Sequence, residues 1–176
     1  MTLVIRAPSA RRSKAGIAKA AAIIREGGVV VFPTETVYGI GANAFDEQAC
    51  RNIYRIKGRA SDNPLIVHVS SMEMADSVGV IPKRYRAALQ EIWPAPLTVV
   101  VKAKALLPKV VTGGLPTVAM RMPDSAVALE LIRQSGTPIA APSANISKKP
   151  SSTSAQHALG YFRGKVGAII NKSKLI

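Results

Sequence analysis

The sequence predicts an α/β protein in which a mostly buried, single-domain sheet is flanked by helices. Three observations support this prediction. Apolar runs of strand length alternate with segments of helical spacing, glycine or proline punctuates most of the boundaries, and 48% of the residues are hydrophobic. A chain of 176 residues has the usual size of one domain, and we find no repeat or linker. We therefore expect residues 1–176 to form a single domain.

The N-terminal part contains two expected helices and two expected strands. In order, these are a helix over 13–26, a strand over 29–32, a helix over 46–56 and a strand over 65–69. Ser13 and Asp46 are suitable N-caps, and glycines follow both helices. The run 29–32 is wholly apolar, as expected for a strand covered on both faces. We expect the segment 33–43, which is rich in turn-forming residues, to be a loop.

The C-terminal part continues the alternation. In order, we expect a helix over 82–92, strands over 97–102 and 117–122, a helix over 124–134, a strand over 138–141, a helix over 153–161 and a strand over 166–171. The loop 142–152 joins the strand 138–141 to the helix 153–161. The order of strands in the sheet does not follow from this pattern.

Charge is the strongest compositional signal. Lysine and arginine number 24 against 10 acidic residues, which gives a net charge of +14. Such a surplus favours polyanionic partners, either nucleotide phosphates or nucleic acid. The alternative is charge spread over the surface for solubility, because the basic residues are scattered along the chain.

Several classes of protein are disfavoured by composition. No apolar stretch approaches bilayer length, and the N-terminus lacks the pattern of a signal peptide, so we expect a cytoplasmic protein without a membrane partner. Cys50 is the only cysteine, so an internal disulfide is impossible. With only two histidines beside it, the usual zinc spacings are absent, and we expect no metal held by the protein itself.

Two motifs that suggest enzymes are weak here. Residues 39–44 satisfy the loose dinucleotide pattern G-x-G-x-x-A, but residues 33–38 separate it from the preceding strand. Ser143 lacks the flanking glycines of a nucleophile elbow. A serine hydrolase and a Rossmann-type dehydrogenase are therefore disfavoured.

The informative polar residues are cations and one histidine. Lys57 and Arg59 flank a glycine directly after a helix, where they can converge on one polyanion, or can instead complement the helix dipole. His68 faces away from its apolar neighbours on a strand, as a ligand contact or as a structural histidine. Arg121 ends a strand, where it can meet a ligand or lie on the surface.

Five ordered segments together resemble one known family. These are 33–41 (PTETVYGIG), 57–59 with 63–65 (KGR and NPL), 93–98 (WPAPLT), 121–123 (RMP) and 142–145 (PSAN). They are similar to the YrdC-like threonylcarbamoyl-adenylate synthases.

The resemblance implies a twisted sheet with a basic concave cleft. It also implies a reaction in which L-threonine, bicarbonate and ATP give threonylcarbamoyl-AMP and pyrophosphate, with Mg²⁺ carried on the ATP phosphates. The product would supply a downstream transferase complex that modifies adenosine 37 of tRNA. The carbamate itself attacks the α-phosphate, so the protein would act by positioning and charge stabilisation.

The resemblance also assigns the candidate site residues. Lys57 and Arg59 would be catalytic, and Thr36, His68, Arg121 and the backbone of Ala141 would hold threonine. The residues assigned to ATP are Arg59, Asn63, Thr117, Ser143, Asn145 and Ser151.

The sequence departs from the family pattern in ways that keep alternatives open. Ala60 and Ala95 replace a common proline and glycine, and the C-terminus after residue 171 looks short, which would leave one wall of the cleft incomplete. The main alternative is therefore a non-catalytic module of the same fold that binds double-stranded RNA or tRNA through its charge. Carbamoyl-adenylate chemistry like that of hydrogenase maturation proteins has less support, because that domain belongs to a much longer chain.

Overall fold

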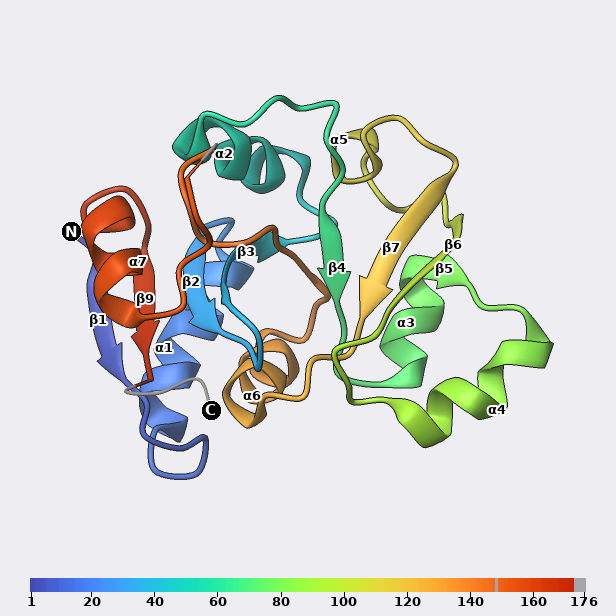
Figure 1. Ribbon diagram of the computed structural model, residues 1–176, viewed down its shortest axis with the longest axis horizontal. Coiled ribbons are helices and arrows are strands. Elements are labelled where there is room, and N and C mark those ends of the chain that lie inside the picture. The colour runs from blue at the N-terminus through green and yellow to red at the C-terminus, as the bar shows by residue number, and fades with distance from the viewer. Residues whose placement is uncertain (148, 173–176) are drawn as a thin grey trace.

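A nine-stranded sheet runs through the part of the chain described by the structure, a computed structural model that covers residues 1–147 and 149–172. The strands are β1 (Leu3–Arg6), β2 (Val30–Pro33), β3 (Tyr38–Asn43), β4 (Ile66–His68), β5 (Gly79–Val80), β6 (Thr98–Ala103), β7 (Thr117–Arg121), β8 (Ile139–Ala140) and β9 (Ala168–Asn171). Their order is β1-β9-β2-β3-β8-β4-β7-β6-β5, with parallel and antiparallel neighbours mixed (Figure 1).

Seven helices in the described residues surround this sheet. They are α1 (Lys14–Arg25), α2 (Glu47–Lys57), α3 (Met72–Val78), α4 (Lys83–Ile92), α5 (Lys109–Thr112), α6 (Ala126–Ser135) and α7 (Ala155–Phe162). Each helix of the described residues is too short or too polar to serve as a membrane span.

Two apolar cores lie on opposite faces of the sheet. Helices α1 and α6 pack together over one face, while α2 and α7 contribute to the core on the other (Figure 1). Strand β2 shows why its sequence has no polar residue. Val30 and Phe32 belong to the first core, and Val31 belongs to the second, so both faces of the strand are buried.

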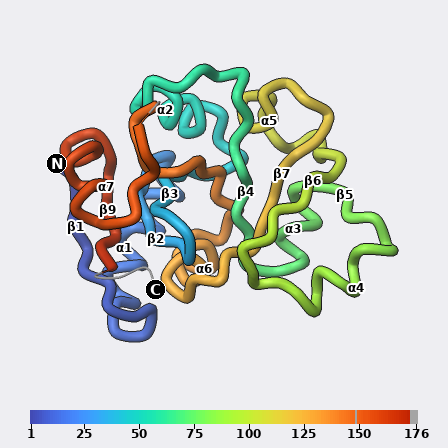
Figure 2. The backbone as a smooth tube through the Cα atoms, in the orientation of Figure 1, coloured from blue at the N-terminus to red at the C-terminus, as the bar shows by residue number. Residues whose placement is uncertain are grey.

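The first and last strands of the chain lie side by side. β1 pairs in parallel with β9, which in turn pairs in parallel with β2, and Figure 2 shows the blue and red ends of the tube together. The Thr2 hydroxyl adds a bond of 2.7 Å to the carbonyl of Val166. The two ends of the described chain therefore stabilise the same sheet edge.

Most elements expected from the sequence are confirmed, with boundaries that move by at most two residues. Asp46 caps α2 as expected, since its side chain accepts a bond from the amide of Ala49. Ser13 stands at the N-cap position of α1 but makes no capping hydrogen bond there. Four short elements were not expected, namely β1, α3, β5 and α5.

The expected loop over 33–43 was wrong in its second half. Strand β3 occupies those residues and pairs antiparallel with both β2 and β8. Its glycines are needed for close packing: a Cβ on Gly41 would lie 2.5 Å from the Cγ2 of Ile139. These glycines belong to a strand, so the dinucleotide pattern at 39–44 has no structural basis.

The sheet brings the ends of distant strands together. β4 and β7 run in parallel and end at the paired residues His68 and Arg121. The tight turn between β2 and β3, here called the hairpin turn (34–37), lies on the same side of the sheet as the loops that follow α2 and β8, since all of these segments line one cavity.

Candidate active site

Two polar cavities of about 380 Å³ each adjoin at the loops after α2 and β8. The hairpin cavity is lined by the hairpin turn, the start of β3, the loop before β4, β4 itself, the end of β7 and the segment after β8. The helix-end cavity is lined by residues 57–60 at the end of α2, by Asn63, and by Ser143, Asn145 and Ser147. Arg59, Asn63 and Ser143 line both, so two ligands could lie in contact there.

Lys57 is the last residue of α2 and is only 1% exposed. Gly58 follows in the left-handed region at φ 59°, which ends the helix and turns the chain away. The Lys57 ammonium donates to the carbonyls of Ser143 (2.5 Å) and Asn145, and the Asn145 Oδ1 lies 3.5 Å away. Burial, reinforced by the nearby charge of Arg59, lowers the pKa of Lys57 to about 8.

The loop after β8 is therefore held by the end of α2. The amide of Ser147 donates back to the Lys57 carbonyl at 3.1 Å, and the Ser143 hydroxyl donates to Asn145 Oδ1 at 2.6 Å. An ammonium has three donors, and three oxygens of this loop surround it. Lys57 acts first as an anchor of the loop.

Arg59 and Asn63 belong to a loop that is fixed by its backbone carbonyls. The Arg59 guanidinium donates to the carbonyls of Asn63 (3.4 Å) and Pro64 (3.2 Å). The Tyr54 hydroxyl lies 2.9 Å from the same Asn63 carbonyl and 3.0 Å from that of Val110, joining the loop to α5. The remaining N–H groups of Arg59 can serve an anionic ligand, because a guanidinium has five.

His68 is an uncharged side chain in the wall of the hairpin cavity. It is buried, and its Nδ1 lies 3.2 Å from the Ile66 carbonyl, while the ring of Phe32 packs against it edge-on at 6.0 Å. Burial, together with the positive charge of Arg121, lowers its pKa to about 3. His68 can thus offer polar ring atoms to a ligand at neutral pH without adding charge.

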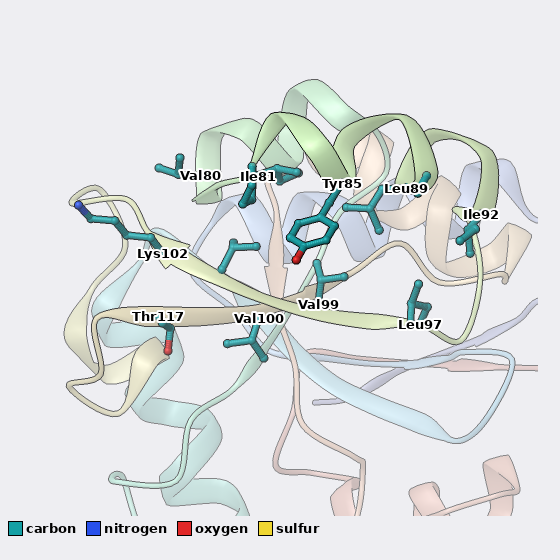
Figure 3. Close-up of a pocket in the computed structure, with 13 residues that line it drawn as sticks. Val80, Ile81, Tyr85, Leu89, Ile92, Leu97, Val99, Val100, Lys102 and Thr117 are labelled. Atoms are coloured by element: carbon teal, nitrogen blue, oxygen red, sulfur yellow. The ribbon is translucent and has the colours of Figure 1, made fainter.

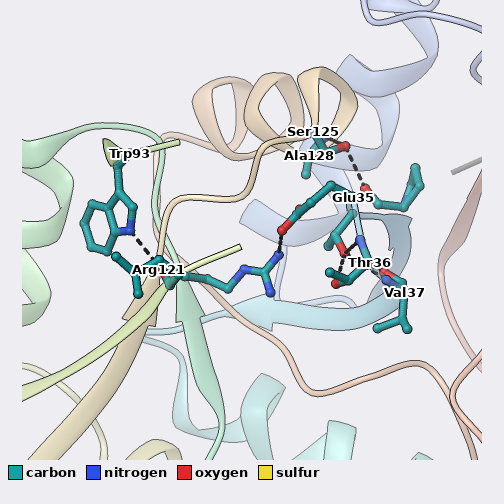
Figure 4. A network of polar contacts seen from close by, with 10 residues as sticks. Glu35, Thr36, Val37, Trp93, Arg121, Ser125 and Ala128 are labelled. Carbon is teal, nitrogen blue, oxygen red and sulfur yellow. Dashed lines mark hydrogen bonds and ion pairs between the residues drawn. The ribbon is translucent and has the colours of Figure 1, made fainter. Parts of the chain in front are cut away.

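Arg121 is the cation of the hairpin cavity, and it pairs with Glu35 of the hairpin turn (Figure 4). The contact joins an Nη of Arg121 to Oε1 of Glu35. The turn itself is fixed, since the Ser125 hydroxyl donates to the Pro33 carbonyl at 3.1 Å and Thr34 Oγ1 donates to the Val37 carbonyl at 2.6 Å.

The structure brings most of the residues predicted from the sequence together. Thr36, His68, Arg121 and Ala141 line the hairpin cavity, Lys57 and Asn145 line the helix-end cavity, and Arg59, Asn63 and Ser143 line both. The cations at 57, 59 and 121 therefore line the cavities.

Two residues predicted to contact ATP, Thr117 and Ser151, lie outside the linings of the two polar cavities. Thr117 lines a separate apolar groove of about 670 Å³ between α4 and β6 (Figure 3), because it begins β7 whereas the cavity meets the end of that strand. Ser151 is exposed and lines neither polar cavity. Their assignment to ATP stays a prediction.

Sequence reasoning did not single out Glu35 or Tyr54. Glu35 lies within the PTETVYG segment, but only the fold reveals that it faces Arg121, 86 residues away. Tyr54 resembles any core aromatic of an amphipathic helix, and its hydroxyl acquires a role through the loops packed on it. No local signal marks either residue.

The fold and the cavities together describe an α/β protein with two adjoining cavities lined in part by cations and amide groups. A family model for Sua5, YciO and YrdC proteins, described as "Telomere recombination", matches residues 22–176. The chain therefore belongs to the Sua5/YciO/YrdC family.

Named relatives and a solved structure agree with this assignment. The chain is 53% identical over 153 residues to a threonylcarbamoyl-AMP synthase of Pyrococcus abyssi, which covers 86% of this chain and 45% of the relative. The Bacillus subtilis threonylcarbamoyl-AMP synthase is 51% identical over 158 residues, covering 88% of this chain and 45% of that protein. A crystal structure of P. abyssi Sua5 complexed with L-threonine superposes with a TM-score of 0.92 at 47% identity, over 99% of this chain and 51% of that one. The chain thus spans about half the length of these proteins.

Proposed function

We propose that this chain carries the active site of an L-threonylcarbamoyladenylate synthase, a nucleotidyltransferase that acts in tRNA modification. The observation that carries the proposal is the pair of adjoining cavities with shared walls at Arg59, Asn63 and Ser143. Two substrates bound there would meet at these residues. The names of the relatives, and the L-threonine bound to P. abyssi Sua5, support the same reaction.

In this proposal, threonine occupies the hairpin cavity. Arg121 provides the positive charge for its carboxylate. Thr36 and the neutral His68 provide polar atoms for its hydroxyl and amine, and Ala141 contributes through its backbone. The low pKa of His68 suits this role, because a neutral imidazole does not repel the amine or compete for the carboxylate.

ATP occupies the helix-end cavity. Arg59 binds the phosphates, and Asn63, Ser143 and Asn145 bind phosphate or ribose oxygens through their polar atoms. Lys57 adds a positive charge behind the loop and keeps Ser143 and Asn145 in place. Thr117 and Ser151 do not line this cavity.

The reaction needs no nucleophile from the protein. The threonine amine combines with bicarbonate to give a carbamate and water. A carbamate oxygen then attacks the α-phosphorus of ATP, and the bond from that phosphorus to the α,β-bridging oxygen breaks, so that the β- and γ-phosphates leave as pyrophosphate. Arg59 and the field of Lys57 would stabilise the charge that develops on the phosphates.

Magnesium fits this site only as a companion of ATP. The described residues hold no group of three or more histidine, cysteine, aspartate or glutamate side chains that could bind a metal ion. Mg²⁺ would then be held through phosphate oxygens and water, and would neutralise charge on the leaving pyrophosphate.

The destination of the product completes the proposal. Threonylcarbamoyl-AMP would pass to a transferase complex that modifies adenosine 37 of tRNA, and the enzyme would act in the cytoplasm with its tRNA. The net charge of +14 favours transient contact with tRNA. RNA binding without catalysis is the weaker alternative, since the named relatives are synthases.

Pyrophosphate release from ATP by the purified chain tests the proposal, with threonine and bicarbonate each omitted in turn. We expect release only when both are present. Release that needs neither would indicate an ATPase, and no release from a folded chain that binds RNA would favour the RNA-binding alternative.

A further inference from the structure

Arg121 already has a carboxylate partner in this structure. Its guanidinium pairs with Glu35, which reaches across from the hairpin turn to the end of β7 (Figure 4). Both side chains are largely shielded from solvent, at 12% exposure for Arg121 and 16% for Glu35. The group that would bind a substrate carboxylate is therefore held by a carboxylate of the chain.

The pair is incompletely satisfied. The Arg121 Nε and the Glu35 Oε2 are buried, and neither has a hydrogen-bond partner among the described residues. Arginine and a carboxylate commonly form two parallel hydrogen bonds, whereas one is present here. A ligand carboxylate that enters the hairpin cavity can approach the guanidinium and satisfy donors that Glu35 leaves unused.

The backbone around Glu35 is anchored. Thr34 Oγ1 lies within 3.3 Å of the amides of Thr36 and Val37, and Pro33 is bonded to Ser125 of α6. Thr34 and Thr36, on either side of Glu35, line the cavity. Glu35 can therefore separate from Arg121 by rotation of the two side chains, while the backbone of the hairpin turn stays in place.

From these contacts we propose that Glu35 competes with the substrate carboxylate for Arg121 and thereby sets the affinity for threonine. This inference rests on the proposed function, in which Arg121 binds that carboxylate. The pair keeps the guanidinium oriented and charge-balanced in the empty cavity. Threonine binding replaces the internal carboxylate by the external one.

Glu35→Gln tests the inference, because it removes the negative charge and retains the size of the side chain. Calorimetric titration with L-threonine should give a Kd about fivefold lower than that of the parent chain, since a neutral acceptor holds the guanidinium less strongly than a carboxylate does. Glu35→Ala should also lower the Kd for L-threonine. The matched control is Glu47→Gln, which breaks an exposed Glu–Arg pair on α2 and should leave the Kd unchanged.

L-Threoninol, which lacks the carboxylate, distinguishes competition from a general change in the cavity. Glu35→Gln should not improve its binding. A Kd for threonine that is unchanged or raised in Glu35→Gln would overturn the inference, because Glu35 would then be inert or would support Arg121. An equal gain for threoninol would overturn it as well. If Arg121→Gln leaves the Kd for threonine unchanged, the threonine subsite of the proposed function fails instead.

Discussion

Lys57 is a positively charged residue that is almost fully buried, and the hydrogen bonds to its neighbours compensate for the loss of hydration. Its ammonium faces three oxygens of the loop after β8, and so replaces lost water by hydrogen bonds. Lys57→Ala would remove the lysine donor from the carbonyls of Ser143 and Asn145 and create a cavity. We expect the free energy of unfolding to fall by about 2 to 4 kcal/mol in urea titrations. The rate of pyrophosphate release should also fall, because the loop that Lys57 anchors carries Ser143 and Asn145, which are proposed to bind ATP.

Lys19→Ala is the control for this prediction, since Lys19 is an exposed lysine of α1. Its effect on unfolding should be within about 0.5 kcal/mol. If Lys57→Ala lost activity but kept the stability of the parent chain, Lys57 would act on substrate and not as the anchor of the loop.

His68 makes the stability of the chain depend on pH. Its pKa is about 3 in the folded protein and near 6.5 in the unfolded chain, so the unfolded chain takes up a proton first as the pH falls. The free energy of unfolding should therefore decrease between pH 6.5 and pH 3. Between pH 7 and pH 5, this one group accounts for a loss of about 2 kcal/mol.

Urea titrations at pH 7 and pH 5 measure that loss. In His68→Gln, the part due to the imidazole should disappear, whereas His157→Gln, at an exposed position of α7, should keep it. A parent chain and a His68→Gln variant that lose stability equally would contradict the assignment.

Individual site residues differed in how well the sequence predicted them. Lys57, Arg59, His68 and Arg121 are polar residues next to helix or strand ends, and such residues stand out in an apolar chain. Glu35 did not stand out, because its partner lies on a strand four places away across the sheet from β2. Thr117 was assigned to ATP by the resemblance alone, and the structure places it at the start of β7, whereas the hairpin cavity meets the end of that strand.

At the level of elements, the sequence predicted the long helices and the wholly apolar strands. It did not predict short elements that depend on distant partners. β1 has four residues and is held by β9, which lies more than 160 residues later in the chain. β3 was hidden by its two glycines, which favour turns in isolation but here permit close contact with β2 and β8.

Gly41→Ala tests the packing of β3. The new methyl carbon would lie 2.5 Å from a side-chain carbon of Ile139 and 3.0 Å from one of Phe32, both on neighbouring strands, so the packing around Gly41 must shift. We expect a loss of about 1 to 3 kcal/mol in the free energy of unfolding. Because β3 forms part of the hairpin cavity, threonine binding should weaken as well.

Gly160→Ala is the matched control, in helix α7 with no atom within 4 Å of the added carbon. It should stabilise the chain by about 0.5 to 1 kcal/mol, because alanine favours the helix. Destabilisation by both substitutions to the same extent would show that the loss at Gly41 has another origin than close packing.

At the scale of the whole molecule, the cleft depends on how the sheet is assembled. The hairpin of β2 and β3 belongs to one side of the sheet, while β4 and β7 belong to the other, and β8 joins them. The general α/β architecture follows from the alternation of elements in the sequence. The position of the two cavities next to each other does not follow from the sequence, because it depends on the order of the strands in the sheet. Local sequence patterns do not determine that order.

The shared wall of the cavities predicts that the two substrates help each other to bind. Arg59, Asn63 and Ser143 face both cavities, so a ligand in one orders groups that also contact a ligand in the other. The affinity for ATP should therefore rise by about fivefold or more when threonine is saturating, and threonine should gain by the same factor in the presence of ATP. Calorimetric titrations of each ligand, with and without the other, measure both factors. Arg59→Ala should weaken ATP binding and reduce the coupling together. Equal affinities with and without the second ligand would mean that the cavities act independently despite their common wall.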